Sequence, residues 1–292
     1  MKAGVCYYIF MQAFALLFLG IFFRFYNPEL YIFGFDQIQI LENAQSIANF
    51  DFTLIGPRTG PANMFTGPLV YYITAFFLPF FGGEVWAIVA MSSFIAGLTG
   101  IALYLLAKKY TTRSQALFML IIWTFSPLLL HFDRIAWNPN FSFLASLLVF
   151  FPVLHAIQGK KITRYELICI FLGSFLGFQA HFSGLLLPPL LFLSLLVFRK
   201  FSLSAVVSSG LGLLASITPT LIFDARNGWL NTRGFLSFVS HQESVGTTLI
   251  TDRLLHSLKV TFQTVGSLIP VQLEKHTAVF FGCVFLLSLL WL

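Results

Sequence analysis

Apolar runs, each about the length of a membrane-spanning helix, recur along the whole chain. About 20 apolar residues in a helix cross a hydrocarbon core of about 30 Å. Hydrophobic residues make up 58% of the 292 residues and charged residues only 10%, whereas soluble domains are about 25% charged. One soluble core could not bury so much apolar surface. We therefore expect an all-α polytopic membrane protein with a single transmembrane domain over 1–292.

Eight apolar segments are predicted to span the membrane. The first run is too long for a signal peptide and has no small-residue cleavage site, so we interpret it as an uncleaved span. The last run stops without a polar flank, so we expect the chain to continue beyond Leu292. The predicted spans are 5–23, 84–107, 115–132, 140–157, 165–182, 184–198, 203–223 and 276–292.

A further segment, 67–82, is apolar but short, and Pro68, Pro79 and Gly82 interrupt it. If it crossed the membrane, Lys2 and the later basic clusters would lie on opposite sides, against the positive-inside rule. If it stays on the outer surface, every basic cluster faces the cytoplasm. We therefore predict that 67–82 does not cross. The clusters concerned are Lys2, Lys108, Lys109, Arg113, Lys160, Lys161, Arg164, Arg199 and Lys200.

This topology places the polar chemistry in four outer segments: a first loop over 24–83, a short loop around Asp133, a tight turn at His181 and a segment over 224–275. Ten of the eleven acidic residues, all except Glu166, then lie outside. The net charge of +6 reflects topology, since the cations form no stripe that would indicate nucleic acid. The three cysteines lie in apolar runs without metal-ligand spacing and are predicted to be packing residues. Apolar residues at helical spacing over 254–269 predict an amphipathic helix on the membrane surface.

The first outer loop contains the most informative motifs. After Asp36, apolar residues recur every three to four positions as far as Ala48, which predicts a short surface helix. Asp36 has two interpretations at this point, as a helix N-cap or as a chemical group. Beyond it, Gly56-Pro57-Arg58-Thr59-Gly60-Pro61 and Thr66-Gly67-Pro68-Leu69-Val70-Tyr71-Tyr72 supply turns, a cation and two tyrosines. A mere connector would not need so elaborate a loop.

In their order and spacing these motifs resemble the GT-C superfamily of glycosyltransferases. The likeness is to bacterial relatives of the dolichyl-phosphate-mannose protein mannosyltransferases and to the lipid A aminoarabinose transferases. It extends to Phe81-Gly82 and to the stretches 132–140, 179–183 and 219–228. The resemblance implies a GT-C-like transmembrane helix bundle whose outer first loop carries juxtamembrane helices. It also implies sugar transfer from a polyprenyl-phosphate donor to a lipid, glycan or protein acceptor on the outer face.

The resemblance implies a role for each matched residue. Asp36 would be the general base of an inverting transfer. The polyprenyl phosphate leaves as an anion, so it needs only cations to stabilise it. Those cations would be Arg58, Arg134 or Arg226. The implied substrate contacts are Glu42, Tyr71, Tyr72, Asp133 and His181. The pattern specifies no cofactor and leaves a divalent cation open.

Two positions depart from the family pattern, and several alternatives stay open. Many relatives have a second acid where this chain has Gln37, and a Lys where it has Gly67. The arginines implied as phosphate ligands near helix ends, Arg134 and Arg226, are equally explained by snorkelling to headgroups. The neighbouring acids Asp133 and Asp224 would then pair locally with them.

Two other function classes are also considered. A transporter or flippase of lipid-linked sugars would have ionisable groups at mid-membrane. Here the charged residues lie mainly at the ends of the predicted spans. A purely structural subunit fits the long first loop less well. Short loops and modest size favour a prokaryotic plasma membrane with an outward-facing site.

Overall fold

The computed structural model describes residues 2–59, 64–81, 84–240, 255–256, 259–260 and 263–264. The predicted span 276–292 and most of the predicted helix over 254–269 lie outside these residues. Almost all described secondary structure is helical, as expected. Its elements are α1 (Lys2–Phe25), η1 (Pro28–Leu30), α2 (Phe35–Ala48), β1 (Arg58–Thr59), β2 (Met64–Phe65), α3 (Leu69–Phe81), α4 (Glu84–Tyr110), α5 (Arg113–Phe125), α6 (Pro127–Asp133), η2 (Asn138–Asn140), α7 (Phe141–Ile157), α8 (Arg164–Ala180), η3 (Phe182–Leu186), α9 (Leu187–Val197), α10 (Leu203–Arg226) and α11 (Leu230–Ser240).

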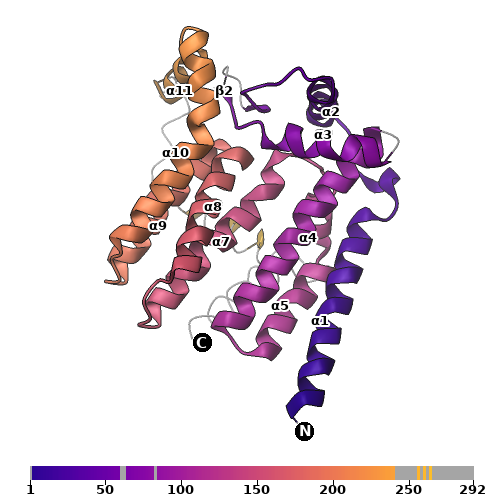
Figure 1. Cartoon of the computed structure of the whole chain (residues 1–292), viewed down its shortest axis with the longest axis vertical. Helices are drawn as coiled ribbons and strands as arrows, with labels where there is room; N and C mark the ends of the chain where they lie inside the picture. The colour runs from indigo at the N-terminus through magenta and orange to yellow at the C-terminus, as the bar shows by residue number, and fades with distance from the viewer. Residues whose placement is uncertain are drawn as a thin grey trace.

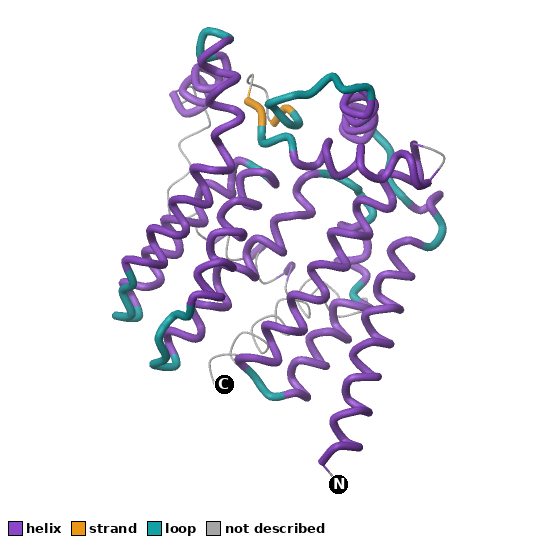
Figure 2. Tube along the Cα trace, viewed as in Figure 1, coloured by secondary structure: helices purple, strands orange, loops and turns teal. Residues whose placement is uncertain are grey.

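The long helices run side by side as a bundle, and α2 and α3 lie across one of its ends (Figure 1). Within the bundle, α4 packs against α1, α5 and α7, and α8 packs against α7 and α10. In the described part of the chain, short loops join most helices, and the longer connection from α2 to α3 carries β1 and β2 (Figure 2). The chain therefore forms a helical membrane domain with a small surface layer at one end.

Fewer helices reach membrane length than the sequence predicted. Among the described residues, Val85–Tyr110, Asn138–Ile157 and Leu203–Arg226 are long and apolar enough to cross a membrane. A fourth span results if α5 and α6, bent by 59° at their junction, count as one. The bend follows from Pro127, which cannot continue α5 and begins a new helix capped by the Ser126 side chain. The predicted span 184–198 is likewise divided into η3 and the short α9.

The segment predicted not to cross forms α3, which lies across the bundle end and not along it (Figure 1). One face of α3 is buried through Val70, Tyr71 and Ala75, whereas Phe76 and Phe80 on its other face are exposed. The N-terminus and the α4–α5, α7–α8 and α9–α10 turns all lie at the opposite end (Figure 1). The basic clusters therefore share one end of the molecule, as predicted.

A buried arginine joins three helices beneath α2 and α3. The Arg24 side chain, which is 0% exposed, donates from Nε to Asp133 Oδ2 at 2.5 Å. Its two terminal nitrogens donate to the carbonyls of Gly20 and Trp123, both at 2.9 Å. The guanidinium carbon also lies 4.1 Å from the centre of the Trp123 ring. These contacts connect the end of α1 to α5 and α6 and compensate the buried charge.

A buried carboxylate joins three helices at the basic end. Glu166 Oε1 accepts hydrogen bonds from Lys109 Nζ at 2.8 Å and Tyr110 Oη at 2.5 Å. The same oxygen lies 2.6 Å from His155 Nδ1. Glu166 Oε2 accepts from the Thr163 backbone and hydroxyl at 2.7 and 2.9 Å. Glu166, the one acid predicted to lie on the inner side, therefore connects α4, α7 and α8.

We expect Glu166→Ala to destabilise the bundle by about 2 to 4 kcal/mol. The substitution leaves a lysine and a tyrosine without their shared acceptor and removes the carboxylate beside His155. Partial exposure of Lys109 holds the cost below that of a fully buried pair. Thermal unfolding in detergent measures the effect. Asp51→Ala, which removes an exposed carboxylate, is the matched control. A Glu166→Ala protein that unfolds at the wild-type temperature would contradict this account of the inner end.

Candidate functional site

Asp36 lies in the first turn of α2 but does not cap the helix. The N-cap is Gly34, whose backbone N–H donates to Gln37 Oε1 at 2.9 Å. Gln37 is 3% exposed, and its Nε2 donates to the Ile135 carbonyl at 2.5 Å. The N-cap interpretation of Asp36 is therefore wrong. A carboxylate at position 37 could not donate to Ile135, which gives a physical reason for the amide found there.

The Asp36 side chain is exposed, and among the described residues it makes no hydrogen bond or ion pair. The positive end of the helix dipole favours a carboxylate at this position. Further along α2, Ile40 and Ala44 are fully buried in the cluster shared with α3 and α4. The helix therefore holds an available carboxylate on a fixed support. Glu42 is also exposed, six residues further along α2.

The two tyrosines of α3 have different environments. Tyr71 is 2% exposed, and burial raises the pKa of its hydroxyl, with the nearby charge of Asp36 raising it further. Tyr72 is half-buried; its hydroxyl donates to the Thr53 carbonyl at 2.8 Å, and its ring stacks on Phe52. Tyr71 thus lies within electrostatic range of Asp36, whereas the Tyr72 hydroxyl bonds the loop between α2 and β1.

Arg134 lies in the segment on which the start of α2 is anchored. The Ile32 N–H donates to the Arg134 carbonyl at 3.2 Å. The Arg134 side chain donates from Nη2 to the Phe23 carbonyl at 2.6 Å, and its buried Nε has no partner among the described residues. Asp133 pairs with Arg24 and not with Arg134, so the expected local pairing is wrong here.

The other two candidate arginines lie in a second group at the end of α10. Asp224 does not pair with Arg226; it accepts from the backbone N–H groups of Asn231 and Thr232 at 2.7 and 2.9 Å. Asn231 Oδ1 in turn accepts from the Phe65 backbone N–H at 2.7 Å. Phe65 is the strand partner of Arg58, so β1 pairs with β2, and β2 lies against α11 and contacts α10 through the Phe65 and Phe223 rings. Both Arg58 and Arg226 are exposed there.

His181 follows α8 and begins η3. Its Nδ1 accepts from the Ser183 backbone N–H at 3.2 Å, so the neutral ring carries its proton on Nε2. Burial lowers the pKa of this imidazole and so favours the neutral form. His181 therefore presents a hydrogen-bond donor, and its half-buried ring is accessible from the same end of the bundle as α3.

Gln179 joins α8 to α3 and α10. Its Oε1 accepts from the Leu69 backbone N–H at 3.0 Å, and its Nε2 donates to the Ser216 carbonyl at 3.2 Å. Gly67 lies so close that a Cβ there would come within 2.1 Å of Gln179 Oε1. A lysine at position 67, as in many relatives, would collide with this amide.

The structure thus brings together Asp36, Tyr71 and the Arg134 segment, and it groups Arg58 with Arg226 elsewhere. Sequence reasoning missed the positioning side chains Arg24, Gln37, Asn138 and Gln179. Of these, Asn138 donates to the Ala180 carbonyl and so connects η2 to the end of α8. In the described part of the chain, no three His, Cys, Asp or Glu side chains are grouped to hold a metal.

Two apolar pockets lie beside the C-terminal part of α1. One, of about 290 Å³, is lined by α1, α3 and α4, including Phe25, Phe77 and Phe94. The other, of about 510 Å³, shares Phe25 and includes Trp86. Both are open and have mainly aromatic and aliphatic walls. Such a surface suits an acyl or polyprenyl chain.

A family model described as dolichyl-phosphate-mannose-protein mannosyltransferase matches residues 65–223, more than half of the 292 residues. No curated protein and no solved structure matches the chain. The matched stretch includes Tyr71, Tyr72, Asp133, Arg134 and His181 and excludes Asp36, Glu42, Arg58 and Arg226. Together with the helical membrane fold, the match establishes that the chain belongs to the dolichyl-phosphate-mannose-protein mannosyltransferase family and is a membrane glycosyltransferase of the GT-C type.

Proposed function

We propose that this protein transfers a sugar from a polyprenyl-phosphate donor to an acceptor hydroxyl at the outer face of a prokaryotic plasma membrane, with Asp36 as general base. The observation that carries the proposal is the exposed Asp36 carboxylate, which has no partner among the described residues and lies on a helix packed against α3. It lies on a surface helix at the end opposite the basic clusters, which the positive-inside rule assigns to the cytoplasm.

The reaction needs one carboxylate. Asp36 accepts the proton of the acceptor hydroxyl while the hydroxyl oxygen forms a bond to the anomeric carbon of the sugar. The bond from that carbon to the phosphate oxygen breaks, and its electron pair leaves with the polyprenyl phosphate. A single displacement inverts the anomeric configuration. Since the leaving group is already a stable anion, no general acid is needed.

Of the three candidate arginines, Arg134 fits the donor phosphate best. Its segment contacts the start of α2 through Ile32, whereas Arg58 and Arg226 belong to the α10–α11 group. Its buried Nε has no partner among the described residues, so a phosphate oxygen would satisfy an unmet donor. The Arg134 side chain also donates to the Phe23 carbonyl. Phe23 lies in the same turn of α1 as Phe22 and Phe25, which line the apolar pockets. A polyprenyl chain in those pockets would place its phosphate near this guanidinium.

The remaining residues proposed to contact the substrates are His181, Tyr71, Tyr72, Glu42 and Asp133. His181 is suited to donate from Nε2 to a sugar or phosphate oxygen. Asp133 acts through Arg24, because its Oδ2 is engaged in the ion pair. We therefore treat Asp133 as a positioning residue. A transporter is less well supported, since the buried charged side chains Arg24, Glu166 and Asp224 lie towards the ends of the bundle.

We expect Asp36→Asn to reduce turnover by about 10² to 10⁴ while donor binding stays close to wild type. A base contributes only in the transition state, so its loss lowers kcat without weakening the ground-state complex. The measurement is sugar transfer from polyprenyl-phosphate sugars in proteoliposomes. Asp51→Asn, which neutralises an exposed carboxylate just beyond α2, controls for the change in charge. Near-normal turnover of Asp36→Asn would exclude the base assignment.

We expect Arg134→Ala to raise the donor KM by about tenfold to a hundredfold, because a charge-assisted contact contributes about 1.5 to 3 kcal/mol. Arg134→Lys should restore only part of the loss if the contact is bidentate. The matched controls Arg58→Ala and Arg226→Ala should change the donor KM much less. The opposite order of effects would move the phosphate site to the α10–α11 group.

A further inference from the structure

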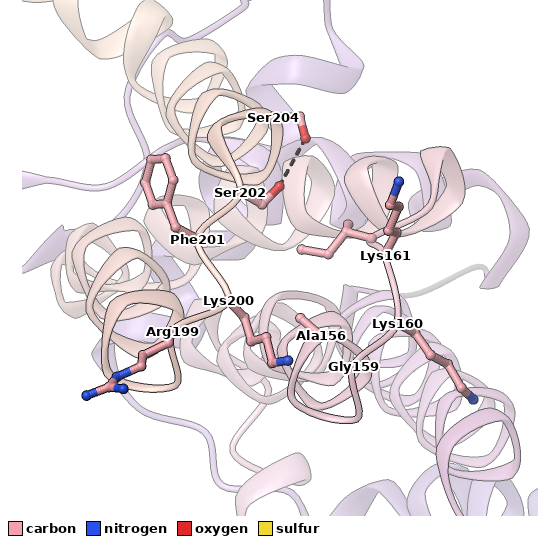
Figure 3. Close-up of a pocket in the computed structure, with 10 residues that line it drawn as sticks. Ala156, Gly159, Lys160, Lys161, Arg199, Lys200, Phe201, Ser202 and Ser204 are labelled. Carbon is pink, nitrogen blue, oxygen red and sulfur yellow. Dashed lines mark hydrogen bonds between the residues drawn. The ribbon is translucent and has the colours of Figure 1, made fainter.

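A second polar site lies at the basic end of the bundle, far from α2 and α3. It is a pocket of about 470 Å³ between the α7–α8 and α9–α10 turns. Figure 3 shows Lys200 extending across the pocket towards Ala156 and Gly159. In the same view, Lys160, Lys161 and Arg199 project outward from its rim. The remaining polar lining comes from Ser202 and Ser204.

The two turns that form the pocket are built alike. Gly159 ends α7 with φ 81° and Arg199 ends α9 with φ 53°, so both lie in the left-handed region. The lysine after each donates its backbone N–H to a carbonyl five residues earlier, Lys160 to His155 and Lys200 to Leu195. Glycine is preferred at such a helix end. An arginine at position 199 is therefore strained in its backbone and adds a cation to the rim.

The four cations of this site have no anionic partner in the described part of the chain. No carboxylate there lies within 4.0 Å of the side-chain nitrogens of Lys160, Lys161, Arg199 or Lys200. The nearby Glu166 is already engaged with Lys109 and the other groups of its cluster. Four exposed cations around one pocket attract an anion that can accept several hydrogen bonds. Phosphate is such an anion.

Exposed apolar side chains adjoin the pocket on the membrane side. Phe201 is 55% exposed and contacts the Phe192 ring edge-on, and Leu203 at the start of α10 is 65% exposed. Along α9, Leu196 and Val197 are 45% and 66% exposed. This apolar flank offers acyl chains a place beside a phosphate held by the cations. A free phosphate ion would make no use of it.

We propose that this pocket binds the phosphate headgroup of an anionic phospholipid from the inner leaflet, with its acyl chains along α9 and the start of α10. A lipid headgroup and inorganic phosphate could both bind these cations through a phosphate group. The apolar flank is the feature that selects the lipid. Such a lipid would join the α7–α8 and α9–α10 hairpins at their inner ends.

The test uses the full-length protein, delipidated in detergent and followed by its thermal unfolding. Dioctanoyl phosphatidylglycerol should raise the unfolding temperature in a saturable manner, whereas dioctanoyl phosphatidylcholine and inorganic phosphate should not at equal concentration. Replacing Lys160, Lys161 and Lys200 together by Gln should weaken the apparent affinity for phosphatidylglycerol at least tenfold. Arg113→Ala, which removes a cation from the α4–α5 turn at the same end, should leave it unchanged.

Arg199→Gly separates binding from folding. It removes a rim cation and relieves the left-handed strain, so the lipid-free protein should be at least as stable as wild type while binding falls severalfold. Wild-type affinity in both the triple variant and Arg199→Gly would overturn the site. Equal stabilisation by inorganic phosphate and phosphatidylglycerol would overturn the lipid assignment in favour of a free anion.

Discussion

The buried guanidinium of Arg24 fixes the outer end of the bundle, and the position of the proposed base depends on it. Through Asp133 and the Trp123 carbonyl, it joins α1 to the break between α5 and α6. The segment that follows α6 then holds α2, because the Ile32 N–H donates to the Arg134 carbonyl and the Gln37 amide donates to the Ile135 carbonyl. Asp36 is the residue next to Gln37. A buried charge is stable there only because its donors are matched by acceptors from three helices.

The two ends of the bundle differ in chemistry. At one end, a surface layer of α2 and α3 presents a free carboxylate above apolar pockets, which suits transfer from a lipid-linked donor. At the other end, basic turns surround the fully engaged Glu166. The proposed lipid site uses the cations that Glu166 does not neutralise. Under the positive-inside rule, the basic end would face the cytoplasm and the proposed site would face outward.

Much of this arrangement followed from local sequence rules. Prolines and the positions of the basic clusters predicted that 67–82 stays at the surface, and three-to-four-residue spacing predicted α2. Long-range partners could not be predicted in this way. Arg24 and Asp133 are 109 residues apart, and the adjacent Arg134 was the natural partner to expect. Gln37 was interpreted only as a departure from a family pattern, because its hydrogen bond to the Ile135 carbonyl joins positions 98 residues apart in the sequence.

The central claim is that the Asp36 end and the basic end lie on opposite sides of the membrane, with Asp36 outside. Single cysteines at two exposed positions test it after Cys6, Cys169 and Cys283 are replaced by Ala: Asn49→Cys at the end of α2 and Ser114→Cys at the start of α5. An impermeant thiol reagent should label Asn49→Cys in intact cells and Ser114→Cys only after permeabilisation. Labelling of both from one side, or of Asn49→Cys only after permeabilisation, would contradict the account.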